Sequence, residues 1–128
     1  MDSYQFSFEK LEVWQLSRIL SCDIYLMSKA FPAEERFSLT AQTRRAALSV
    51  SANIAEGSSR INPKDQARFT IMAYSSLMEL FNHIIIASDL GYITSQELVE
   101  FRRKIQILSV KLNNLKVVQL KRDKKNGE

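Results

Sequence analysis

The sequence predicts an all-α protein, an antiparallel four-helix bundle with up-down-up-down topology. Its 128 residues contain three glycines and two prolines, so few positions interrupt a helix. Apolar residues recur at spacings of three and four, and the alternating pattern typical of strands is missing. A chain of this length fits one domain, residues 1–128, which buries about two-thirds of its unfolded surface. Four helices joined by short connections then pack as a bundle.

The first two helices are expected at about residues 8–30 and 39–58. The first has an apolar side formed by Val13, Leu16, Leu20, Ile24 and Met27. It should end before Pro32, because proline disfavours helical conformation in the preceding residue. Near the end of the second helix, Gly57 suits a C-terminal cap.

The third and fourth helices are expected at about residues 63–89 and 95–120. Asn62 is a suitable N-cap for the third helix, and Pro63 suits its first position. Gly91 should end that helix. Thr94 and Glu97 form the capping box that opens the fourth helix. Its seam alternates steps of three and four through Leu98, Phe101, Ile105, Leu108, Leu112 and Leu115.

The positive charge of the chain is concentrated at its end. The net charge is +4, and the segment from residue 116 onward holds five basic and two acidic residues, a net +3. Residues 121–128 are therefore expected to form a basic C-terminal tail. Such a tail is commonly a solvated, disordered end, although it can also hold phosphates.

Polar residues gather on one side of the predicted second helix. At about 100° per residue, six positions fall within an arc of roughly 80°. They are Gln42, Arg45, Ser49, Asn53, Glu56 and Arg60. A solvent-exposed face is the ordinary use of such a stripe, but serine and asparagine are poor choices for one in mid-helix. We expect a structural polar network or interface, in which Glu56, and Glu79 of the third helix, pair with Arg45 or Arg60.

The same segment carries a resemblance to a known family. The matching residues are Leu39-Thr40-Ala41-Gln42, Arg44-Arg45-Ala46, Ser49, Asn53-Ile54-Ala55-Glu56-Gly57 and Arg60. With further matches from Phe8 to about Leu115, they resemble the small bacterial four-helix bundle proteins found within intervening sequences of 23S rRNA genes. These proteins are often labelled ribosomal proteins because their reading frames were noticed inside ribosomal RNA genes.

The resemblance implies an assembly and partners. Members of this family form ring-shaped homopentamers, which implies a homo-oligomeric ring, a pentamer, for this chain. A related protein accompanies the reverse transcriptase of diversity-generating retroelements and is thought to engage that enzyme and nucleic acid. One departure affects this inference: members often have Arg-Gly where this chain has Tyr74-Ser75.

The predicted helices also carry more apolar surface than one bundle core requires. Beyond its seam, the fourth helix contains Ile107, Val110, Val117, Val118 and Leu120. The third helix contains an apolar run at residues 84–86. We therefore expect self-association independently of the resemblance.

Catalytic chemistry is not expected. The one histidine, His83, follows Glu79 by four residues, whereas a di-iron bundle uses two Glu-x-x-His motifs. Glycine-rich phosphate loops and zinc motifs are missing, so no cofactor or metal is expected. The single cysteine, Cys22, excludes a disulfide framework.

The sequence favours a cytoplasmic protein without a membrane partner. Acidic residues Asp2, Glu9 and Glu12 are unlike the start of a secretory signal. The longest apolar run, residues 84–87, is much shorter than the roughly twenty residues of a membrane span.

Two functional hypotheses follow. The first is a non-catalytic oligomeric scaffold that binds RNA or DNA phosphates without sequence preference. The residues expected to do so are Arg102, Arg103, Lys104, Lys121, Arg122, Lys124 and Lys125. No aromatic residue is interleaved with these clusters, which argues against base stacking. The second hypothesis is a protein-interaction adaptor, for example for a reverse transcriptase, without direct nucleic-acid binding.

Overall fold

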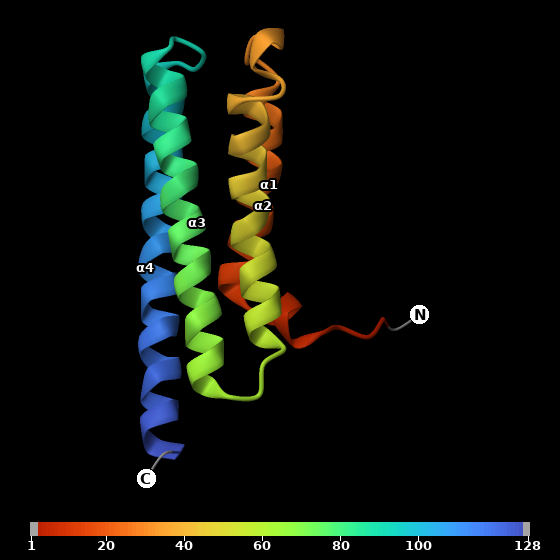
Figure 1. The fold of residues 1–128 in the computed structure, drawn as a ribbon, viewed down its shortest axis with the longest axis vertical. Coiled ribbons are helices and arrows are strands. Elements are labelled where there is room, and N and C mark those ends of the chain that lie inside the picture. The colour runs from red at the N-terminus through yellow and green to blue at the C-terminus, as the bar shows by residue number, and fades with distance from the viewer. Residues whose placement is uncertain (1–2, 127–128) are drawn as a thin grey trace.

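The chain folds as four long helices in up-down-up-down order (Figure 1). The structure, a computed structural model, describes residues 3–126. Its elements are the 3-10 turns η1 (Ser7–Lys10) and η2 (Ala33–Glu35) and the helices α1 (Glu12–Ser28), α2 (Leu39–Ser58), α3 (Pro63–Asp89) and α4 (Ser95–Asn126). The described residues form no strand. The predicted all-helical class is therefore confirmed.

The first helix differs from its predicted bounds. Residues 7–10 form a separate 3-10 turn, because Leu11 has the extended backbone conformation φ −76° and ψ 128°. The ring of Phe8 packs edge-on against Trp14 at 4.9 Å between centroids, which folds this turn back onto α1. α1 then ends at Ser28, before the turn that leads to Pro32. The sequence correctly predicted that this helix ends before Pro32, but the observed end lies two residues before the predicted one at residue 30.

The end of α2 reveals a different role for Gly57. It is buried within the helix, whose C-cap is Ser59, so it is not the cap that the sequence suggested. A Cβ atom at position 57 would lie 2.8 Å from Cβ of Phe69 on α3. Glycine is required here because it lets α2 and α3 approach closely.

The predicted caps of α3 and α4 are present. Asn62 Oδ1 accepts a hydrogen bond from the backbone N–H of Lys64 at 2.8 Å. Gly91 ends α3 with φ +79°, a left-handed conformation that favours glycine. The backbone N–H of Thr94 donates to Glu97 Oε1 at 2.9 Å, and the N–H of Glu97 donates to Thr94 Oγ1 at 3.0 Å. These two bonds form the capping box.

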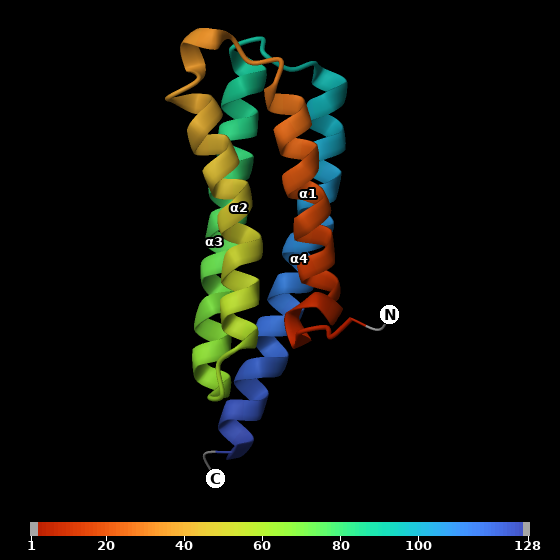
Figure 2. The same ribbon diagram turned by 90° about the vertical axis from the view of Figure 1, so that its right-hand side faces the viewer.

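α4 continues well beyond its predicted end. Residues 121–126 are helical, so the expected disordered tail is corrected over this range, while residues 127–128 lie outside the described part. Thr70 Oγ1 of α3 donates a buried hydrogen bond of 2.7 Å to Gln119 Oε1, which fastens this part of α4 to the bundle. The last turns project past the α2–α3 connection (Figures 1 and 2).

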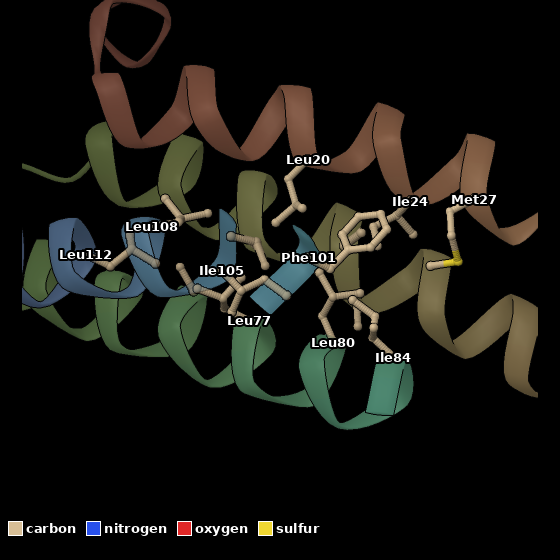
Figure 3. Close-up of a cluster of buried hydrophobic side chains, with 14 of the residues drawn as sticks. Leu20, Ile24, Met27, Leu77, Leu80, Ile84, Phe101, Ile105, Leu108 and Leu112 are labelled. Carbon is tan, nitrogen blue, oxygen red and sulfur yellow. The ribbon is translucent and has the colours of Figure 1, made fainter. Parts of the chain in front are cut away.

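α3 is the central helix of the arrangement. It packs extensively against both α2 and α4, whereas α1 packs against α2 and makes a much smaller contact with α4. The core lies between these helices (Figure 3). Its members include Leu20, Ile24, Met27, Leu77, Leu80, Ile84, Phe101, Ile105, Leu108 and Leu112.

α3 is also the one helix among the described residues that is long and apolar enough to cross a membrane by length and composition. The core helix of a bundle meets the same criteria, so this property is weak evidence for a span. Here Leu77, Leu80 and Ile84 of α3 are fully buried against the other helices. The expectation of no membrane partner remains a prediction.

The close approach at Gly57 can be tested with Gly57→Ala. Alanine favours a helix interior by about 1 kcal/mol over glycine. Overlap with Phe69 should reverse this gain and lower the free energy of unfolding by roughly 1–3 kcal/mol, the usual cost of overpacking. Urea denaturation measures the change. Ala52→Gly, at an exposed position of α2, measures the propensity contribution alone. A Gly57→Ala protein more stable than wild type would disprove the steric argument.

Candidate nucleic-acid interface

The predicted polar stripe of α2 lies beside α3 at the surface of the bundle. Arg45 forms an ion pair with Glu79 of α3 and also donates to Gln42 Oε1 at 3.1 Å. The same oxygen of Glu79 lies 3.1 Å from Nε2 of His83. Arg45 and Glu79 are both substantially exposed, so their pair contributes little stability, typically below about 1 kcal/mol.

A second group of stripe residues lies nearer the helix contact. The hydroxyl groups of Ser49 and Ser76 are 2.9 Å apart across the α2–α3 seam. Asn53 Nδ2 donates to the carbonyl oxygen of Ser49 at 2.9 Å and to its hydroxyl at 3.2 Å. These bonds lie within one subunit and explain why serine and asparagine occupy mid-helix positions.

The other two stripe residues do not join this network. Arg60 places its guanidinium 4.7 Å from the ring centroid of Phe69. Glu56 is exposed and forms no ion pair with any residue of the described chain. The partnership expected between Glu56 and an arginine is therefore not seen. The stripe divides into a surface ion pair at Arg45, an internal seam at Ser49 and Asn53, and an open end at Glu56 and Arg60.

The arrangement offers little catalytic chemistry. Within residues 3–126, no three histidine, cysteine, aspartate or glutamate side chains lie close enough to hold a metal ion. The lone histidine, His83, is mostly buried and faces Glu79 on its own helix. The absence of an enzymatic activity remains a prediction.

The first predicted phosphate-binding cluster, on α4, is occupied within the subunit. Arg102 stacks 4.9 Å from the ring centroid of Phe81. Arg103 donates to Glu100 at 2.6 Å, and this hydrogen bond lowers the pKa of Glu100 and raises that of Arg103. The ammonium of Lys104 lies 3.0 Å from the carboxylate of Asp23 on α1. Two of the three cations are already neutralised.

The second predicted cluster is different. Lys121, Arg122, Lys124 and Lys125 are exposed on the projecting end of α4. None of them forms an ion pair with another described residue. At about 100° per residue, the four fall within an arc of roughly 160°. They form one basic half of the helix end, called here the α4 tip.

A third basic surface was missed in the sequence. It lies at the opposite end of the bundle, where α1 is joined to α2 (Figures 1 and 2). A groove there is lined by Tyr25, Arg36, Phe37, Thr40, Ala41, Arg44, Arg45 and Leu48. Its basic residues come from a turn and a helix, so their sequence spacing hides the cluster. The adjacent pair Arg36-Phe37 was the available signal, and it shows that basic and aromatic residues are interleaved here.

The connection that carries this groove is tied to the rest of the fold. Ser38 Oγ donates to Glu35 Oε1 at 2.6 Å, and the Tyr92 hydroxyl donates to Glu35 Oε2 at 3.0 Å. These two bonds hold the pKa of Glu35 below its ordinary value. Desolvation and the bond to Glu35 raise the pKa of Tyr92. Tyr92 also packs on Phe31 at 5.6 Å, so the α1–α2 and α3–α4 connections are joined.

Apolar side chains remain uncovered between α1 and α4. A groove there is lined by Leu16, Ile19, Leu20, Asp23, Arg103, Lys104, Ile107 and Leu108. Ion pairs cross it at Asp23–Lys104, 3.0 Å, and farther along the helices at Glu12–Lys111, 2.8 Å. Ile19 in this groove, and Leu26, Val110 and Val118 on the same two helices, are half or more exposed.

The internal seam can be tested by a double-mutant cycle on Ser49→Ala and Ser76→Ala. Because the two hydroxyl groups bond each other across α2 and α3, the cycle should give a coupling free energy of roughly 0.5–1.5 kcal/mol. Urea denaturation supplies the four free energies of unfolding. Ser51→Ala with Ser75→Ala, which alters the same helices without a shared bond, should give no coupling. Equal coupling in both cycles would argue against the seam.

The bundle architecture is shared with a protein of known structure. The chain is similar to a crystal structure of a protein of unknown function from the S23 ribosomal protein family of Bacteroides thetaiotaomicron. The TM-score is 0.74 at 19% identity, and the match covers 80% of this chain and 96% of the other, which shows a shared fold. No curated protein matches the chain. Residues 9–114 match the family described as 23S rRNA-intervening sequence protein, and the chain belongs to that family.

Proposed function

We propose that this protein is a non-catalytic, cytoplasmic scaffold that binds nucleic acid through phosphates in several copies at once. The α4 tip carries the proposal. Its four cations are exposed, lie on one half of a helix and are unpaired within residues 3–126. A cation that is not neutralised by a carboxylate can displace the counterions of a phosphate, which is the main source of sequence-independent affinity.

The tip is built to present these charges. Gln119 fastens α4 to Thr70 of α3 immediately before the basic residues. The following turns remain helical beyond the bundle, so the charges are held at fixed spacing and are not dispersed along a disordered tail. Contacts of this type position a protein on a phosphate backbone without reading bases. The other α4 cluster, Arg102 to Lys104, contributes less because Arg103 and Lys104 are paired with carboxylates of the subunit.

Self-association is the second part of the proposal. The apolar groove between α1 and α4 and the exposed side chains around it are available to another copy of the chain. A ring of five, as the family resemblance implies, would present five α4 tips on one particle. Linked weak sites raise overall affinity strongly when one ligand engages them together. Assembly therefore compensates for the small number of phosphate contacts in one tip.

An adaptor without direct nucleic-acid binding is the second candidate. The observation that favours it is the outer face of α3, where Ile71, Met72, Met78 and Ile86 are exposed. Methionine side chains adapt readily to different partner surfaces. A protein such as a reverse transcriptase would then bind this face of the scaffold. Binding to a protein partner that survives removal of the α4 tip charges would favour this candidate.

The α4 tip can be tested with the double variant Lys121→Gln and Lys124→Gln. Affinity for RNA and duplex DNA should fall. The slope of log affinity against log salt should become shallower by about 0.9 for each phosphate that the variant no longer neutralises, up to about 1.8 per subunit. Fluorescence anisotropy over a salt series measures both quantities.

A charge-matched control separates the tip from net charge. Arg68→Gln with Lys111→Gln also removes two positive charges, but these are paired with Asp65 and Glu12 and do not line the apolar groove between α1 and α4. This variant should keep most of the affinity. Equal reductions of affinity in the two variants would mean that only net charge matters, and an absence of binding by wild type at low salt would refute the proposed function.

Self-association can be tested with Ile19→Asp and Ile107→Asp. Both side chains line the apolar groove between α1 and α4, so a carboxylate at either position should be costly at a buried subunit contact. Size-exclusion chromatography with light scattering should give an oligomer for wild type and smaller particles for the variants. Ile61→Asp, at a 97% exposed position, should assemble normally. A wild-type monomer at micromolar concentration would remove this part of the proposal.

A further inference from the structure

We propose that the groove at the α1–α2 connection binds single-stranded nucleic acid, with Phe37 as a stacking platform for a base. The groove residues that matter are Tyr25, Arg36, Phe37, Arg44 and Arg45. This inference rests on the proposed function and deepens it, because it adds a second site with a different chemistry from the α4 tip. The tip holds phosphates alone, whereas the groove also contacts bases.

The charge of the groove favours an anionic ligand. Arg36 and Arg44 form no ion pair with any described residue, and Arg45 shares the one carboxylate of Glu79 with His83. Arg44 is held by its Nε, which donates to Ser28 Oγ at 2.8 Å, while its guanidinium lies 4.8 Å from the ring centroid of Tyr25. Arg36 and Arg44 thus supply two unpaired guanidinium groups to a groove whose lining contains no carboxylate.

Phe37 gives the groove its aromatic character. Its side chain is 86% exposed, although it stands next to a fixed turn. The guanidinium of Arg36 lies 5.3 Å from the ring centroid, so one face of the ring has a cation beside it. A base stacked on the ring would bring its phosphate close to Arg36 and Arg44. Exposed rings beside arginines are the usual platform for unpaired bases.

Single strands fit this arrangement better than duplexes. In a duplex the bases are stacked on one another and are not available to a ring, whereas an unpaired strand presents them. The connection that carries the platform is also held in place, because Ser38 and Tyr92 bind Glu35 two residues before Phe37. The backbone there loses little conformational entropy when a base stacks on the ring.

The two basic sites are far enough apart to be studied separately. α3 has 27 residues and spans the length between them, about 40 Å at 1.5 Å per residue. A stacked strand of about six nucleotides covers about 20 Å and cannot reach both sites of one subunit. A hexanucleotide therefore reports on one site at a time.

The experiment compares hexathymidylate with an abasic hexamer that has the same phosphates. Wild type should bind the thymidylate about fivefold more tightly or better, the effect of one stacked base. Phe37→Ala should abolish this preference, whereas the Lys121→Gln and Lys124→Gln variant should retain it. Arg36→Gln should weaken both hexamers, and Arg68→Gln, which removes an arginine stacked on Phe69, should not.

A spectroscopic readout reports the stacking itself. In Phe37→Trp, emission should fall when hexathymidylate is added and should stay constant with the abasic hexamer. Wild type, whose single tryptophan is Trp14, supplies the background. Unchanged emission on binding would overturn the stacking platform.

The remaining outcomes each decide a different point. Retained preference in Phe37→Ala, with binding intact, overturns the groove and leaves the α4 tip standing. Failure of wild type to bind hexamers and duplex alike overturns both proposals. A changed particle mass for Phe37→Ala, but not for Ile61→Ala, would make the groove a subunit contact. If polyglutamate binds wild type as tightly as hexathymidylate does, and Phe37→Ala weakens that binding, the groove would be assigned to an acidic protein segment instead.

Discussion

The close approach of α2 to α3 is the constraint on which the rest of the structure depends. Gly57 leaves room for Phe69, and the paired hydroxyl groups of Ser49 and Ser76 continue the same seam toward the middle of the helices. Because α3 also packs tightly on α4, three helices form a continuous unit with little space between them. α1 is then held mainly by α2, and its contact with α4 is small. The opening between α1 and α4 is therefore a consequence of where the tight contacts lie, and it leaves apolar side chains such as Ile19 and Ile107 for another molecule to cover.

The distribution of charges follows from the same architecture. Positive residues near the middle of α4 lie beside neighbouring helices, so Lys104 reaches Asp23 and Lys111 reaches Glu12. These pairs hold the edge of the α1–α4 opening, and their cations are then not free to bind phosphates. At the ends of the bundle, helices and turns project away from such partners. The unpaired cations of the α4 tip and of the α1–α2 connection consequently lie at opposite ends of the molecule.

The sequence predicted the fold well because the signals involved are local. Asn62, the Thr94–Glu97 capping box and Gly91 determine helix ends through bonds made within a few residues, and all three act as expected. Gly57 was misread because its role depends on Phe69, a contact between helices that spacing does not reveal. The end of α4 was placed at residue 120, whereas the helix continues to Asn126, beyond the point where Gln119 bonds Thr70, 49 residues away. The site was harder to predict for the same reason. Counting basic residues made Arg102, Arg103 and Lys104 as strong a phosphate-binding candidate as the α4 tip. Which cations meet carboxylates is determined only when the chain folds.

The number of positive charges is thus a poor guide to where a weakly basic protein contacts phosphate, and the partners of each charge are a better one. A cation in a surface ion pair has little electrostatic attraction left for a ligand. To bind a phosphate it must first leave its carboxylate, so the net gain in free energy is small. A cation beside an aromatic ring keeps its charge, because the ring offers polarisable surface and no compensating negative group. Arg36 beside Phe37 and Arg44 beside Tyr25 belong to this second kind. The same stacking that orients their guanidinium groups leaves them able to receive an anion, so the aromatic residues prepare the groove electrostatically as well as sterically.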